Sequence, residues 1–214
     1  MFKNHKIMGQ RGIFLDRDGV IIKDKNNLHK IEDVEIIPGV PDAIKKILKS
    51  IRDKISYEGI KCVDDFHITL KFLGEIDDHH ADRIMQALSL VTFNQFKISL
   101  DETGFFPDEK HMRVVWLGVN PPIQVIELHN MITRALNYEF PERNTFHPHI
   151  TLARMRAVSD KKQFLETINS IEIPKKTVSV KHFALFKSKL TLKGPVYELL
   201  ESYDCVGQGS NMSP

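Results

Sequence analysis

The tetrapeptide HITL occurs twice in this chain, at residues 67–70 within DDFHITLKFLGEI and at residues 149–152 within TFHPHITLARMRA. Successive side chains of a β-strand point to opposite faces, so the histidine and threonine of each copy share one face and the isoleucine and leucine share the other. A repeated tetrapeptide arises by chance about one time in seven in a chain of this length, so the repeat alone is a weak sign of duplication. The chemistry of the repeated side chains has to decide whether the repeat is functional.

A histidine and a hydroxyl group on one strand face can act together on a phosphate. The threonine donates a hydrogen bond to a non-bridging oxygen, and the histidine transfers a proton. Two such strands that face each other would place His67 and His149 on opposite sides of a phosphorus atom. In-line displacement needs this arrangement, with a base on the attacking oxygen and an acid on the leaving oxygen. A single histidine and threonine on one strand face are more often an ordinary half-exposed pair of side chains. Two such motifs, each with its histidine and threonine on the same face of a strand, favour the catalytic interpretation.

Composition sets broad limits on the class of protein. With 214 residues, 42% hydrophobic and 27% charged, the chain suits one globular domain, or one domain with an appendage. No run of about 18 apolar residues is present, and the N-terminus has no secretory pattern. We therefore expect a cytoplasmic protein in which Cys62 and Cys205 are reduced. The net charge of +2 is too small to predict nucleic-acid binding by itself.

Apolar periodicity predicts an α+β fold in which each HITL strand follows a strand and a helix. The expected strands are residues 12–15, 34–37, 59–63, 66–74, 95–106, 113–119, 147–155, 177–190 and 196–203. The expected helices are residues 41–55, 77–91, 121–140 and 160–171. Two similar lobes of one domain are expected, followed by a disordered tail at residues 204–214.

The segments HITLKFLGE and HITLAR, with GFFP and RVVWLGV between them and FALFKSKLTLKGPVYELL after them, resemble the 2H phosphoesterases. The nearest branch is the LigT-like RNA 2′,3′-cyclic phosphodiesterases, also named 2′-5′ RNA ligases, and the resemblance covers about residues 34–203. It implies a bilobal fold of two pseudo-symmetric antiparallel-sheet lobes, with helices outside and the motifs lining a central cleft.

The same resemblance implies an activity and its partners. The activity is hydrolysis of a 2′,3′-cyclic phosphate to a 2′-phosphate, and it extends to reversible 2′-5′ RNA ligation. No metal or other cofactor is implied. The expected partners are RNA ends or cyclic nucleotides, tRNA fragments among them. A monomer without membrane contact is expected.

The resemblance also assigns roles to residues. His67 and His149 become the catalytic pair, and Thr69 and Thr151 hold phosphate oxygens. We assign His149 as the base on water and His67 as the acid to the departing 3′-oxygen. Arg154 is expected near the phosphate. A regular strand would put Arg154 on the face opposite His149, so this role implies a bend or bulge; a plain surface charge stays open as the alternative.

A second resemblance lies at the N-terminus. The segment GIFLDRDGVIIKDKNNLHKIEDVEIIPGVPDAIKKIL resembles the start of haloacid-dehalogenase-type histidinol-phosphate and heptose-bisphosphate phosphatases. In that family Asp16 and Asp18 would be the nucleophile and the acid/base, with Mg²⁺ neutralising charge. The later motifs of that fold are missing, so phosphatase activity is not expected.

We therefore interpret residues 1–33 as a truncated phosphatase-like segment in front of a 2H phosphoesterase domain at residues 34–203. A natural remnant, a gene fusion and an artificial join all fit this sequence. Two segments could form the first strand of the phosphoesterase domain, residues 12–15 and residues 34–37. Spacing favours residues 34–37.

Two other interpretations of the histidines stay open. His67, His147 and His149 could be three ligands of a catalytic zinc ion, although no obvious fourth ligand is present. The fold could also be a non-catalytic module that binds RNA ends.

Lysines and phenylalanines near the motifs also have two interpretations each. Lys187, Lys189 and Lys193 could contact an RNA backbone or mark an exposed sheet edge. Phe72, Phe105 and Phe106 could stack on a base, with core packing expected for at least two of them.

Overall fold

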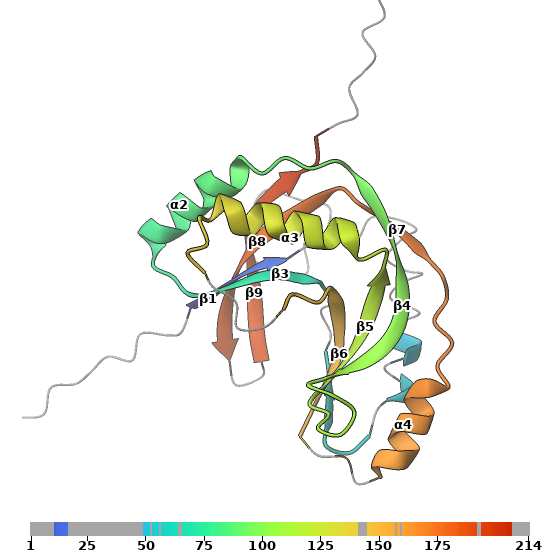
Figure 1. Ribbon diagram of the computed structural model, residues 1–214. Coiled ribbons are helices and arrows are strands. Elements are labelled where there is room, and N and C mark those ends of the chain that lie inside the picture. Colours follow the sequence, from blue (N-terminus) through green and yellow to red (C-terminus); the bar gives the residue numbers. More distant parts are fainter. Residues whose placement is uncertain are drawn as a thin grey trace, which may run out of the picture.

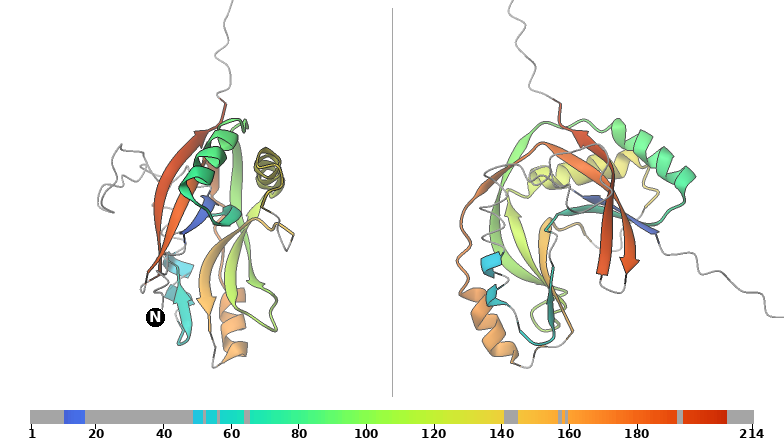
Figure 2. Two further views of the ribbon diagram at one scale, coloured as in Figure 1. Left: turned by 90° about the vertical axis from the view of Figure 1, so that its left-hand side faces the viewer. Right: turned by 180° about the vertical axis from the view of Figure 1, so that it is seen from behind.

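The computed structural model describes residues 11–16, 49–51, 53–55, 57–63, 66–140, 145–156, 158, 160–191 and 194–206. These residues form two antiparallel sheets with helices packed on their outer sides, which confirms the predicted α+β class (Figures 1 and 2). Residues 49–51 and 53–54, the described part of the helix expected at residues 41–55, are helical. Within the described part of the chain, no helix is long and apolar enough to cross a membrane.

The first sheet has the strand order β3-β1-β8-β9, and every neighbouring pair is antiparallel. Its strands are β1 (Arg11–Asp16), β3 (Thr69–Glu75), β8 (His182–Thr191) and β9 (Gly194–Asp204). The sequence-based preference for residues 34–37 as the first strand is wrong, because β1 occupies the interior position between β3 and β8. An interior strand needs donors and acceptors on both edges, and β1 supplies six residues without proline, whereas Pro38 directly follows residue 37.

The second sheet has the order β2-β6-β5-β4-β7 and is also antiparallel. Its strands are β2 (Ile60–Cys62), β4 (Phe96–Phe106), β5 (Val114–Asn120), β6 (His149–Met155) and β7 (Thr177–Val180). The single strand expected at residues 177–190 is therefore wrong. The chain leaves β7 in one sheet and enters β8 in the other sheet, so the join crosses between the lobes.

In the described part of the chain after residue 57, three helices cover the sheets: α2 (Asp78–Ser89), α3 (Ile123–Ala135) and α4 (Lys161–Asn169). Asp77 caps α2 by accepting a hydrogen bond from the backbone N–H of His80 at 2.7 Å. Helix α3 packs on β3, and α2 packs on β9 and α3 (Figure 1). Helix α3 ends at Ala135, earlier than the expected residue 140, because Asn137 and Tyr138 have φ values of 51° and 56°, outside the helical region.

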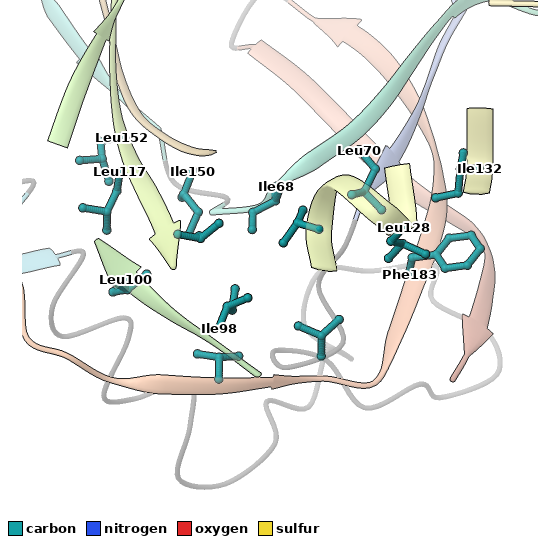
Figure 3. Close-up of a cluster of buried hydrophobic side chains, with 14 of the residues drawn as sticks. Ile68, Leu70, Ile98, Leu100, Leu117, Leu128, Ile132, Ile150, Leu152 and Phe183 are labelled. Carbon is teal, nitrogen blue, oxygen red and sulfur yellow. The ribbon is translucent and has the colours of Figure 1, made fainter. Parts of the chain in front are cut away.

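The two HITL copies meet in one hydrophobic core. Ile68 and Leu70 of the first copy are 3% and 1% exposed, and Ile150 and Leu152 of the second are 8% and 1% exposed. Figure 3 shows these four side chains in a single cluster that joins the two sheets. Burying them fixes both strands, so the opposite face of each strand is left for the histidine and threonine.

The chain remains ordered slightly beyond the predicted start of the tail. Asp204 ends β9, and the backbone N–H of Val206 donates to the carbonyl of Phe93 at 2.9 Å. Residues 207–214 and most of residues 1–48 lie outside the described residues. The phosphatase-like origin of residues 1–33 and the domain start at residue 34 therefore stay predictions, although β1 is part of the first sheet.

Candidate active site

The two motifs have the same burial pattern along seven residues. In residues 67–73 and in residues 149–155 the order is half-buried, buried, half-buried, buried, buried, exposed, buried. His67 and Thr69 share one open face, and His149 and Thr151 share the other, as strand alternation predicted. One detail differs from the prediction, since β3 begins at Thr69 and His67 precedes it.

Each motif strand has a β-bulge at the leucine of HITL. In β6, Thr151 pairs with Trp116 and Ala153 pairs with Val115, which leaves Leu152 without a pairing partner on β5. In β3, Thr69 pairs with Asp16 and Lys71 pairs with Leu15, which leaves out Leu70 in the same way. An extra residue reverses the alternation beyond it.

The bulges bring two further side chains to the open faces. Arg154 follows the second bulge and is exposed, on the same side as His149 and Thr151. The bulge predicted from the position of Arg154 is therefore present. Phe72 is the corresponding residue of the first motif and is 56% exposed, which is unusual for a large apolar side chain.

The ring of His149 has a defined tautomer. Its Nδ1 lies 2.7 Å from the backbone carbonyl oxygen of His147, which can only accept a hydrogen bond. Nδ1 therefore carries the proton and donates it to this carbonyl. In the neutral ring, Nε2 then has a free lone pair and can accept a proton.

Burial lowers the pKa of His149 below its ordinary value of 6.5. The hydrogen bond to the His147 carbonyl acts in the opposite direction, and positive charge on the His147 ring lowers the pKa further. Charges on His67 and Arg154 also lower it, although less strongly. His67, one of these charges, belongs to the other motif. At neutral pH, His149 is a neutral base.

Aromatic rings contact both histidines. The ring of Phe106 meets His149 edge-on with centroids 4.8 Å apart, and the Trp116 ring lies 6.2 Å away. His67 meets Tyr197 of β9 in a T-shaped contact at 5.6 Å. Phe106 therefore contacts a candidate catalytic ring, and of the three phenylalanines Phe105 belongs to the buried core, at 8% exposed. The expectation that at least two of them pack in the core is wrong, because Phe72 is 56% exposed and Phe106 lies outside the core cluster.

Trp116 is a site residue that the sequence analysis missed. It is 9% exposed, contacts His147 at a centroid distance of 4.7 Å, and lies over Gly104 of the neighbouring strand. A Cβ atom at Gly104 would come within 2.1 Å of the indole atom Cζ2. The glycine thus makes room for the indole that supports the His147–His149 segment. Strand register, not local sequence, determines this contact.

His129 of α3 is a second residue missed by the sequence analysis. It is 6% exposed, and its Nδ1 lies 2.7 Å from the carbonyl oxygen of Leu70, at the first bulge. Its ring also stacks on Phe146 with centroids 4.0 Å apart and an interplanar angle of 8°. His129 therefore joins the first motif to the segment that leads into the second. Its helical spacing with the buried Val125 and Ile132 was the only sequence signal.

Other sequence candidates are not brought to this site as expected. Among the described residues, no three His, Cys, Asp or Glu side chains are grouped to hold a metal ion, so the zinc interpretation gains no geometric support. Asp16 ends β1 beside Thr69, and Asp18 lies outside the described residues. Lys187 lies in β8, which has β1 and β9 on its two sides, so the exposed-edge interpretation is wrong for it.

The fold and the paired His-x-Thr faces define the 2H phosphoesterase class. The 2′-5′ RNA ligase superfamily model matches residues 40–191, and the chain belongs to this family. An RNA 2′,3′-cyclic phosphodiesterase of Archaeoglobus fulgidus is 35% identical over 77% of this chain and 96% of its own length. An RNA 2′,3′-cyclic phosphodiesterase of Methanocaldococcus jannaschii is 30% identical over 77% of this chain and 95% of its own length.

Solved structures agree with this fold assignment. Escherichia coli LigT complexed with 3′-AMP superposes with a TM-score of 0.65 at 24% identity, covering 92% of this chain and 99% of that protein.

Proposed function

We propose that this protein hydrolyses RNA 2′,3′-cyclic phosphate ends to 2′-phosphates by acid–base catalysis with two histidines. Nε2 of His149 takes a proton from water as the water oxygen bonds to phosphorus. The bond between phosphorus and the 3′-oxygen breaks, and His67 gives a proton to that oxygen. The observation that carries this proposal is the hydrogen bond from His149 Nδ1 to the His147 carbonyl, which leaves Nε2 as the base.

Three further side chains have proposed roles at the phosphate. The hydroxyl groups of Thr69 and Thr151 donate to the two non-bridging oxygens, and Arg154 neutralises charge that builds up in the transition state. The shared open face of His149, Thr151 and Arg154 beyond the bulge supports these roles. No step needs a metal ion.

The names of the relatives support the substrate class. The relatives in Archaeoglobus and Methanocaldococcus are RNA 2′,3′-cyclic phosphodiesterases, and E. coli LigT was solved with 3′-AMP. By extension, we propose that RNA ends and cyclic nucleotides bind here, to a protein that acts as a monomer.

Incubation of the purified protein with 2′,3′-cyclic AMP and EDTA tests this function. The expected product is 2′-AMP, identified by ³¹P NMR, at the same rate with and without EDTA. Release of 3′-AMP would contradict the assignment of the leaving oxygen. Binding of the cyclic nucleotide without turnover would favour the non-catalytic module instead.

The pH dependence of the reaction follows from the lowered pKa of His149. The base acts only when neutral, so kcat/KM is expected to fall as the pH drops through the pKa of His149 in the folded protein. Because that pKa lies below 6.5, the acid limb of the profile is expected below pH 6.5. Arg154→Gln removes one positive charge that lowers this pKa, so it should move the limb upward. A wild-type limb above pH 6.5 would contradict the assignment.

A further inference from the structure

A pocket of about 250 Å³ is lined by residues of the β4–β5 loop, the end of β6 and the start of α4. We call this site the basic pocket, because four cationic side chains line it: Lys110, Arg113, Arg156 and Lys161. Its other described lining residues are His111 and the apolar Met112, Met155 and Val158, so no acidic side chain is among them. Like charges gathered in a concave site attract an anion.

Among the residues that the structure describes, no neighbour neutralises the cations of the basic pocket. Within the described residues, Lys110, Arg113 and Arg156 have no ion pair or side-chain hydrogen bond, and Lys161 donates only to the Lys110 carbonyl. The nearby carboxylate of Asp108 contacts the ring of His111, with 3.2 Å between Asp108 Oδ1 and His111 Nδ1. The four charges are therefore available to a ligand.

The backbone holds the pocket in a fixed shape. The N–H of Arg113 donates to the Phe106 carbonyl at 2.8 Å, and its own carbonyl accepts from the N–H of Met155 at 2.8 Å. The N–H of Arg156 donates to the Gly59 carbonyl at 3.0 Å, which extends the pairing of β6 with β2. Side chains from three chain segments thus converge on a preformed site.

The basic pocket lies along the same strand as the second motif. Arg156 follows Arg154 by two residues, directly after the end of β6, and both side chains are exposed. Met155 lies six positions after His149, which corresponds to about 20 Å at a rise of about 3.3 Å per residue. A stacked single strand spans this distance with about six nucleotides.

We propose that the basic pocket binds backbone phosphates of the RNA strand several nucleotides upstream of the cyclic end. The inference rests on the proposed function, and it adds a strand-binding subsite to the phosphate site. It predicts that long substrates bind more tightly than cyclic mononucleotides. This preference comes from Arg113 and Arg156, which do not act at the reacting phosphate.

The test compares Arg113→Gln/Arg156→Gln with wild-type protein in binding a fluorescent ten-nucleotide RNA that ends in a 2′-phosphate. We expect Kd to rise several-fold and the salt slope of log Kd to shrink by about 1.4, the value for two single-strand phosphate contacts. The kcat/KM for 2′,3′-cyclic AMP should stay unchanged. Arg83→Gln, which removes an exposed arginine on α2, is the matched control and should alter neither quantity.

Unchanged RNA binding by the double variant would overturn the subsite, even if 2′,3′-cyclic AMP is hydrolysed. The binding measurement needs no turnover, so failure of the proposed function leaves it valid. The proposal would also be overturned if inorganic phosphate, at a concentration equal to that of the RNA, weakened RNA binding by the wild type to the level of the double variant but left RNA binding by the double variant unchanged. That result would assign the pocket to the free ion.

Discussion

Replacing His149 by alanine is expected to lower kcat/KM for 2′,3′-cyclic AMP by about 10² to 10⁴, the usual contribution of one proton-transfer group. His67→Ala should have an effect of the same order. In the first variant no group activates water, and in the second no group protonates the 3′-oxygen. Both rings lie on the open faces of their motifs, opposite the buried isoleucines, so their removal should disturb the core little.

The measurement is initial-rate hydrolysis, with thermal unfolding as a check on folding. His79→Ala, on an exposed position of α2, is a control that should retain full activity. If the His67 variant kept wild-type activity while the His149 variant lost it, the leaving oxygen would have another acid, and the two-histidine scheme would be wrong.

Gly104→Ala is expected to damage both stability and activity. The new methyl group would lie 2.1 Å from Cζ2 of Trp116, so the indole must move away from Gly104. Overpacking of this kind costs about 1–3 kcal/mol in the free energy of unfolding. Because Trp116 packs on His147, whose carbonyl orients His149, kcat should fall as well.

Gly118→Ala provides a matched control for this prediction. Gly118 lies opposite His149 in β5, but the nearest atom to an added Cβ is the Glu102 carbonyl oxygen at 3.3 Å. Its loss of stability should be smaller. For both variants, stability is measured by denaturant unfolding and activity by kcat for 2′,3′-cyclic AMP. Equal behaviour of the two variants would show that the indole is not held in place by Gly104.

The parts of the site that follow from local periodicity were predictable. Alternation placed His67 with Thr69 and His149 with Thr151, and the offset of Arg154 required a bulge that is present. The family resemblance supplied the roles, which local sequence does not contain.

The parts that depend on strand pairing were not predictable. The contact of Trp116 with Gly104 exists only in the register of β4 with β5, and that register depends on residues distant in sequence. Two apolar runs competed for the interior position of the first sheet, and periodicity could not choose between them. The break between β7 and β8 lies in an uninterrupted strand-like pattern, so only the three-dimensional path of the chain reveals it.

The central claim is that the two HITL copies form one site in which both histidines serve the same step. A double-mutant cycle tests it most directly, with kcat/KM for 2′,3′-cyclic AMP measured for wild type, His67→Ala, His149→Ala and the double variant. Groups that act as a unit are strongly non-additive. We therefore predict that the double variant is about as slow as the slower single variant. A loss equal to the product of the two single losses would contradict the claim, because it would mean that the histidines act independently.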